Sequence, residues 1–174
     1  MSENIGAVAQ EMMNTAIKYS EDKSQLYPPD TVLKARARGE CSVCAYLYYG
    51  LARELAEYLS ARDPQVKAVY FYSEPLVQWD DQPADRPNLL PGFHVVVWTE
   101  AKHPALSKLG EALTLALEKE SRRLPCSKAT DLCHWINIAQ VDDLDVEKKS
   151  GYGALLAGHE RRSVEIWHRE TSMA

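Results

Sequence analysis

Two cysteines in the segment GECSVCAYLYYG are the residues best suited to chemistry. Cys41 and Cys44 stand three positions apart at the start of a predicted helix. Unpaired backbone N–H groups and a partial positive charge at a helix N-terminus stabilise a thiolate, which lowers a cysteine pKa from about 8.5. Each of the two cysteines is therefore a candidate nucleophile.

A nucleophilic thiol also needs a base and a group that orients the base. His94, on a predicted central strand, is the candidate base, and Asn137 or Asp142, at or after the next strand, is the candidate orienting group. This order of cysteine on a helix, histidine on a strand and then a polar residue is similar to that in papain-like and transglutaminase-like thiol enzymes. The similarity is one of order, because neither cysteine lies in a family signature and a whole helix is predicted between the two strands.

The same residues also fit purely structural roles. Cys44 falls on an apolar helical stripe, where a cysteine packs as a small hydrophobic residue, and His94 fits a hydrogen-bonded position in a sheet. Because no catalytic motif is complete, the leading interpretation is a small binding or accessory domain for a protein or small-molecule partner. The alternative is a thiol-dependent hydrolase or acyl transferase, which requires a helix-start sulfur within reach of His94.

The four cysteines of the chain also suggest a structural zinc domain. Cys41 and Cys44 have the spacing of one half of a four-thiolate site, and Cys126 and Cys133 would supply the other half. That second pair is spaced more widely than usual, although His134 is a substitute ligand. A redox pair formed by Cys41 and Cys44 is a further alternative. A chain of this length does not need a metal to fold, so we expect no cofactor and keep zinc as the alternative.

Composition narrows the class of partner and compartment. The 174 residues are 45% hydrophobic and 26% charged, which is typical of one globular domain spanning residues 1–174. The net charge of -5 argues against a nucleic-acid partner. No apolar run reaches the roughly 20 residues of a membrane helix, and the N-terminus lacks an export signal. We therefore expect a cytoplasmic protein with reduced thiols and no membrane partner.

Helical periodicity dominates the first third of the chain. Apolar residues recur at three- and four-residue intervals over residues 5–17, which predicts a helix that begins near residue 2 or 4. A shorter helix is predicted over residues 30–39. The longest apolar stripe predicts a helix over residues 42–60, and the β-branched and aromatic residues 66–72 that follow it predict a strand.

Residues 73–92 contain four prolines and little periodicity, which predicts a long surface connection. The apolar residues of this connection would form an exposed patch on a monomer unless they fold back. We therefore expect a homodimer contact there.

The rest of the chain predicts a small sheet. Strands are predicted over residues 93–99, 134–141 and 163–168, with a helix that carries Pro104 in its first turn between the first two. The Gly-rich residues 150–158 predict a loop or short helix. A strand-helix-strand unit favours a parallel crossover, and the helices at the front of the chain favour an α+β class. The expected fold is N-terminal helices packed on a mixed sheet of about four strands.

Overall fold

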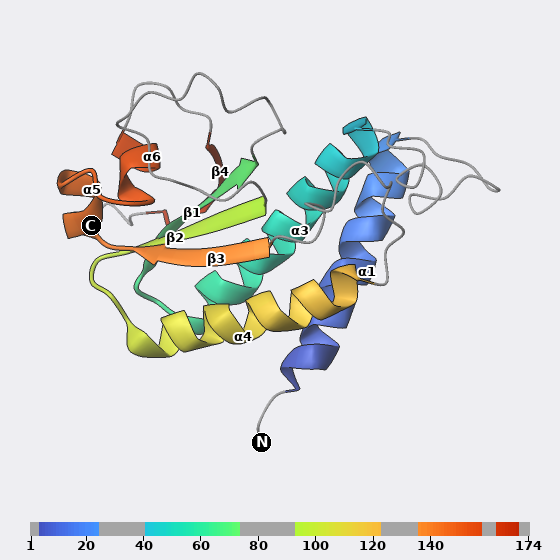
Figure 1. Ribbon diagram of the computed structural model, residues 1–174, viewed down its shortest axis with the longest axis horizontal. Helices are drawn as coiled ribbons and strands as arrows, with labels where there is room; N and C mark the ends of the chain where they lie inside the picture. The colour runs from blue at the N-terminus through green and yellow to red at the C-terminus, as the bar shows by residue number, and fades with distance from the viewer. Residues whose placement is uncertain (1–3, 25–40, 74–92, 123–135, 158–162, 171–174) are drawn as a thin grey trace.

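The computed structural model describes residues 4–24, 41–73, 93–122, 136–157 and 163–170. Helices pack on a mixed four-stranded sheet, so the predicted α+β class is confirmed (Figure 1). In chain order the elements are α1 (Ile5–Ser24), α3 (Cys41–Arg62), β1 (Val66–Ser73), β2 (Phe93–Thr99), α4 (Pro104–Ser121), β3 (Ile136–Val141), α5 (Asp143–Glu147), α6 (Gly153–Ala157) and β4 (Val164–His168).

The sheet has the strand order β3-β2-β1-β4. β1 pairs antiparallel with both β2 and β4, whereas β2 and β3 are parallel. Parallel neighbours cannot be joined by a tight turn, and α4 supplies the crossover that returns the chain to the start of β3. The predicted parallel strand-helix-strand unit is therefore confirmed.

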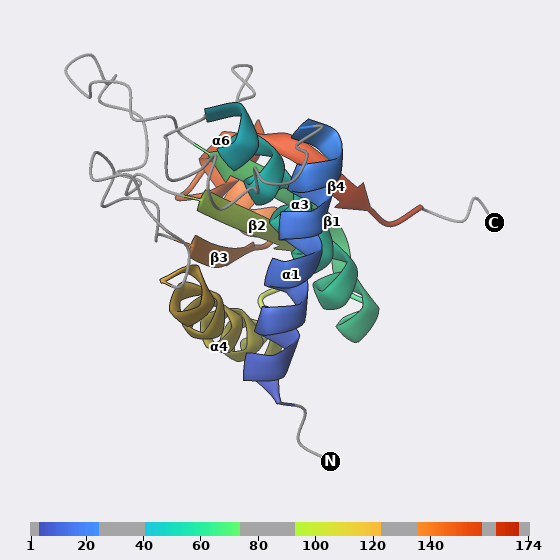
Figure 2. The ribbon, with the colours of Figure 1, turned by 90° about the vertical axis from the view of Figure 1, so that its right-hand side faces the viewer.

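Three helices, α1, α3 and α4, build the main hydrophobic core against one face of the sheet. Figure 2 shows α1 running along this layer, where it contacts both α3 and α4. The contact between α1 and α3 is close at Gly50, because a Cβ there would lie 2.9 Å from the Tyr19 ring. The fully buried leucines and valines of this core are Leu47, Leu51, Leu55, Leu59, Val66, Val69, Val95, Val97, Leu113 and Leu117.

The opposite face of the sheet carries a different set of side chains. Successive residues of a strand point to opposite faces, so the core positions Val95 and Val97 place His94 and Val96 on the other side. In Figure 1, α4 lies below the sheet and α6 lies above it. The second face is therefore the one that the short C-terminal helices approach.

Hydrogen bonds around Asp63 join the C-terminal end of α3, the start of β1 and the end of β4. Its carboxylate accepts a hydrogen bond from the Gln65 backbone N–H at 2.8 Å and lies 2.6 Å from His103 Nδ1. Arg169 donates to the carbonyl oxygens of Val66 and Ser60 at 3.0 and 3.2 Å. The bond to Ser60 satisfies a carbonyl group of the last turn of α3, and the bond to Val66 joins Arg169 to the start of β1.

The structure contains one short helix that the sequence did not predict. The predicted helix over residues 30–39 lies outside the described residues. α5 was not predicted, because a helix of five residues is too short to show a periodic pattern of apolar residues; a cap at Asp142 fixes it instead.

None of the helices in the described ranges is long and apolar enough to cross a membrane.

The assignment of the α4 face can be tested by truncating two leucines of that helix. Leu113 is 0% exposed and Leu115 is 67% exposed. We expect Leu113→Ala to lower the free energy of unfolding by about 2–5 kcal/mol, because it leaves a cavity in the core. Leu115→Ala, the matched control, should change it by no more than about 0.5 kcal/mol in urea denaturation. Equal effects of the two substitutions would contradict the packing of α4.

Candidate functional site

Three polar or aromatic side chains form a row across the second face of the sheet. His94 on β2 is the register partner of Tyr72 on β1 and of Asn137 on β3. Register partners on paired strands point to the same face, so the three side chains are neighbours. The His94 ring lies 6.0 Å from the Tyr72 ring, centroid to centroid, and His94 is only 3% exposed. The strand pairing thus places a buried imidazole beside an amide.

Tyr152 completes this cluster from outside the sheet. Its hydroxyl oxygen lies 2.9 Å from His94 Nδ1 and accepts a hydrogen bond from Asn137 Nδ2 at 2.5 Å. Burial raises the pKa of the Tyr152 phenol above its usual value, while the Asn137 hydrogen bond acts in the opposite direction. The phenol is therefore neutral at pH 7, and one oxygen joins the imidazole to the amide.

The backbone around Tyr152 adopts conformations that residues other than glycine rarely take, and these place the tyrosine at this position. Lys149 and Gly151 have φ values of 52° and 50°, in the left-handed region. A Cβ at Gly153 would collide with the Asp145 carbonyl oxygen, so only glycine fits where α6 begins. The glycines on either side of Tyr152 thus let the chain double back over α5 and direct the tyrosine to the sheet.

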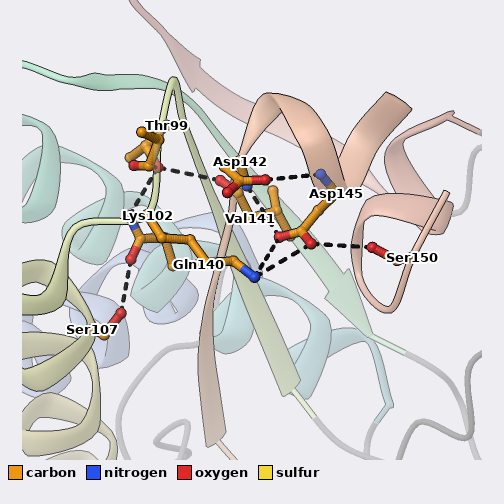
Figure 3. Close-up of polar contacts among 9 residues, drawn as sticks. Thr99, Lys102, Ser107, Gln140, Val141, Asp142, Asp145 and Ser150 are labelled. Carbon is orange, nitrogen blue, oxygen red and sulfur yellow. Dashed lines mark hydrogen bonds and ion pairs between the residues drawn. The ribbon is translucent and has the colours of Figure 1, made fainter. Parts of the chain in front are cut away.

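α5 is fixed by the polar network in Figure 3. Asp142 and Asp145 form a reciprocal capping box, in which each side chain accepts a hydrogen bond from the other's backbone N–H at 2.8 and 3.3 Å. Lys102 forms an ion pair with Asp145 at 3.1 Å, and the Ser150 hydroxyl donates to the same carboxylate at 3.1 Å. The loop that leads to Tyr152 is thus held by a helix cap.

A second carboxylate attaches α5 to the sheet. Asp143 accepts hydrogen bonds from Lys67 Nζ on β1 at 2.6 Å and from Trp98 Nε1 on β2 at 2.8 Å. The Lys67 hydrogen bond is the main cause of a lowered Asp143 pKa; burial opposes it, and the Trp98 hydrogen bond adds to it. Asp143 is therefore a carboxylate at neutral pH, and its two bonds fix α5 across two strands.

The structure brings two of the predicted catalytic residues together and separates a third. His94 and Asn137 are direct partners across β2 and β3. Asp142 lies five positions further along the chain than Asn137 and caps α5, so it is not placed to orient His94. Cys41 is the first residue of α3, and Cys44 falls in its first turn; their side chains lie outside the described part of the structure. Figure 1 shows α3 starting on the side of the molecule where β2 and β3 begin.

The zinc and dimer predictions fall largely on residues that are not described. Cys126 and Cys133, the second half of the predicted metal site, lie outside the described ranges, as does nearly all of the Pro-rich connection. Within the described ranges, no group of three or more His, Cys, Asp or Glu side chains is arranged to hold a metal ion. Both ideas stay predictions.

Sequence reasoning missed Tyr152. It lies in the Gly-rich segment predicted as a loop or short helix, 58 positions after His94 along the chain. The available signal was a tyrosine flanked by two glycines, a pattern that fits a sharply turning backbone with a side chain held in a fixed direction. The residues that Tyr152 contacts could not be predicted from the spacing of residues along the sequence.

The Asp145 network predicts a specific dependence of stability on pH. Burial would raise the pKa of Asp145, but the hydrogen bonds from Lys102, from the Asp142 backbone and from Ser150 outweigh it and hold the pKa below its usual range. A lowered folded-state pKa adds stability that is present above the unfolded value of about 3.9 and is lost as the pH falls through the folded value.

We therefore expect Asp145→Asn to lower the free energy of unfolding at pH 7, and the difference from the wild type to shrink below about pH 4. Denaturant unfolding at several pH values measures both effects. Glu147→Gln, which removes the same charge from an exposed position of α5, is the matched control and should show neither. A difference for Asp145→Asn that stays constant between pH 7 and pH 3 would show that the carboxylate charge is not what stabilises this loop.

Comparison with known proteins identifies no relative. No protein-family model matches the chain, and neither a curated protein nor a solved structure matches it. A function must therefore be argued from the chain's own residues, and the best candidate among the described ones is the cluster of the buried His94 with the partly buried Asn137 and Tyr152.

Proposed function

We propose that the protein is a thiol-dependent hydrolase or acyl transferase, with Cys41 as nucleophile and His94 as base. The observation that carries this proposal is the register of β2 with β3, which makes His94 and Asn137 direct partners. In sequence the two are separated by a whole helix, and the parallel crossover through α4 removes that separation. A buried imidazole held by polar neighbours is what a thiol nucleophile requires of its base.

The position of α3 supports Cys41 as the nucleophile rather than Cys44. Cys41 is the first residue of the helix, where backbone N–H groups have no intrahelical partner and the helix dipole is positive. Both effects favour a thiolate over a thiol. α3 packs against the opposite face of the sheet from His94, but it starts on the side of the molecule where β2 and β3 begin, so the proposal requires the Cys41 side chain to reach the imidazole around that edge (Figure 1).

The proposed reaction is acyl transfer through a thioester. His94 takes the proton of the Cys41 thiol, which gives a thiolate and an imidazolium. The thiolate attacks the carbonyl carbon of an ester or amide; the bond to the leaving group breaks, and the imidazolium returns its proton to the departing oxygen or nitrogen. Water, or an acceptor amine or alcohol, then attacks the thioester, and the thiol is regenerated.

Alkylation of the intact chain by iodoacetamide at pH 7 tests the nucleophile. A thiol of ordinary pKa is only about 3% thiolate at this pH. We therefore expect Cys41, followed by mass spectrometry of its peptide, to react at least about tenfold faster than a model thiol and faster than Cys44. His94→Gln should lower the Cys41 rate severalfold and leave only the activation that the helix N-terminus supplies. His168→Gln, which removes an exposed histidine of β4, is the matched control and should leave the rate unchanged.

Two outcomes would count against the enzyme. If neither Cys41 nor Cys44 reacts faster than the model thiol, the chain holds no activated nucleophile and a binding or accessory domain becomes the better interpretation. If Cys41 reacts rapidly and His94→Gln leaves its rate unchanged, His94 is not the base.

A further inference from the structure

We infer that His103 is a phosphoryl-acceptor site, at which imidazole Nε2 takes a phosphoryl group while the Asp63 carboxylate holds Nδ1. The pair of Asp63 and His103 joins the end of α3 to the start of α4. The inference goes beyond the proposed function and does not depend on it. His103 follows the C-terminal end of β2, whereas Cys41 lies on the side of the molecule where β2 begins (Figure 1).

The contact between the two side chains determines which ring nitrogen is available. Asp63 Oδ2 lies 2.6 Å from His103 Nδ1. A carboxylate accepts hydrogen bonds and has none to donate, so Nδ1 carries the hydrogen of this contact, and the lone pair of the neutral ring is on Nε2. No hydrogen bond to a described residue involves this Nε2, and the His103 side chain is 45% exposed. Nε2 is therefore a nucleophile that is open to solvent.

Asp63 itself is buried and fixed. Its side chain is 7% exposed, and its other carboxylate oxygen accepts the Gln65 backbone N–H at 2.8 Å. Its backbone carbonyl oxygen accepts hydrogen bonds from the Val66 N–H at 3.2 Å and from Arg169 at 3.4 Å. A carboxylate held in this way keeps an imidazole in one tautomer and one orientation.

The donor that fits this nucleophile is an acyl phosphate or a phosphoramidate. The Nε2 lone pair attacks phosphorus and forms the N–P bond. The bond from phosphorus to the leaving group breaks, and that group departs with the electron pair, as a carboxylate or, from an N-protonated phosphoramidate, as ammonia. The ring becomes a phosphorylated imidazolium that keeps its hydrogen on Nδ1. The Asp63 carboxylate lies against that hydrogen and offsets the new positive charge.

The start of α4 supports a phosphoryl group as the electrophile. His103 is the N-cap residue of α4, and its side chain does not cap the helix. Pro104 has no backbone N–H, and the Ser107 N–H donates to the His103 carbonyl oxygen at 3.1 Å. The N–H groups of Ala105 and Leu106 therefore have no acceptor within the helix. N–H groups at the start of a helix are suited to phosphate oxygens.

Phosphorylation of the intact chain by potassium phosphoramidate tests the site, with His168 as the internal control. The Nδ1 of His168 also faces a carboxylate, that of Glu165 at 3.1 Å, but this carboxylate is 46% exposed and His168 itself is 62% exposed. Exposure alone would favour reaction at His168. We expect His103 to react at least about fivefold faster, because its carboxylate is buried and fixed. Mass spectrometry of the peptides measures both rates, and NMR of the product should show the Nε2 isomer of His103 from the first time point.

Asp63→Asn removes the charge of the carboxylate and nearly keeps its shape. We expect it to slow phosphorylation of His103 about tenfold and to leave the rate at His168 unchanged. Glu165→Gln is the matched control and should leave the rate at His103 unchanged. Cys41→Ser should not change that rate either.

The intact chain decides the inference even if Asp63→Asn does not fold. Phosphorylation of His103 that is no faster than that of His168 overturns it, and so does a first product that carries the phosphoryl group on Nδ1 of His103. An unchanged rate at His103 in a folded Asp63→Asn protein overturns it as well. A Cys41 that does not react with iodoacetamide removes the proposed function and leaves this site standing.

Discussion

The parallel pairing of β2 with β3 is the constraint on which the candidate site depends. It makes partners of two residues that stand 43 positions apart, and it does so only because α4 carries the chain back across one face of the sheet. The burial of Leu113 and Leu117 under that helix stabilises the crossover, since apolar side chains on α4 can leave water only against the sheet and the other helices. Hydrophobic packing on one face therefore fixes polar neighbours on the other.

The two faces of the sheet carry different kinds of side chain. One is covered by α1, α3 and α4 and is filled with aliphatic side chains. The other holds His94, Asn137 and Tyr152, whose polar atoms are bonded to one another. A buried polar atom without a partner costs free energy, so such a set is retained only when its members satisfy each other. The same hydrogen bonds also fix the direction of each ring.

Two carboxylates of the short helix α5 link that helix to the sheet and to the loop that carries Tyr152. Asp143 binds groups on β1 and β2, and Asp145 binds Lys102 and Ser150 while it caps the helix. Exposed ion pairs contribute little to stability by themselves. Besides the stability that the Asp145 carboxylate contributes at neutral pH, these contacts define where the loop bearing Gly151 and Tyr152 leaves the helix. Stability of the loop and orientation of the imidazole are thus two consequences of the same contacts.

The sequence by itself determined the class of fold, the positions of the long helices and four strands, and the residue types able to do chemistry. Periodicity and β-branched runs report local geometry, so α1, α3, α4 and the crossover followed from them. Only the tertiary structure decided that Asn137, and not Asp142, stands beside His94, and that Tyr152 lies between the two. Strand register and the course of a Gly-rich segment depend on contacts between distant residues, which spacing along the chain does not encode.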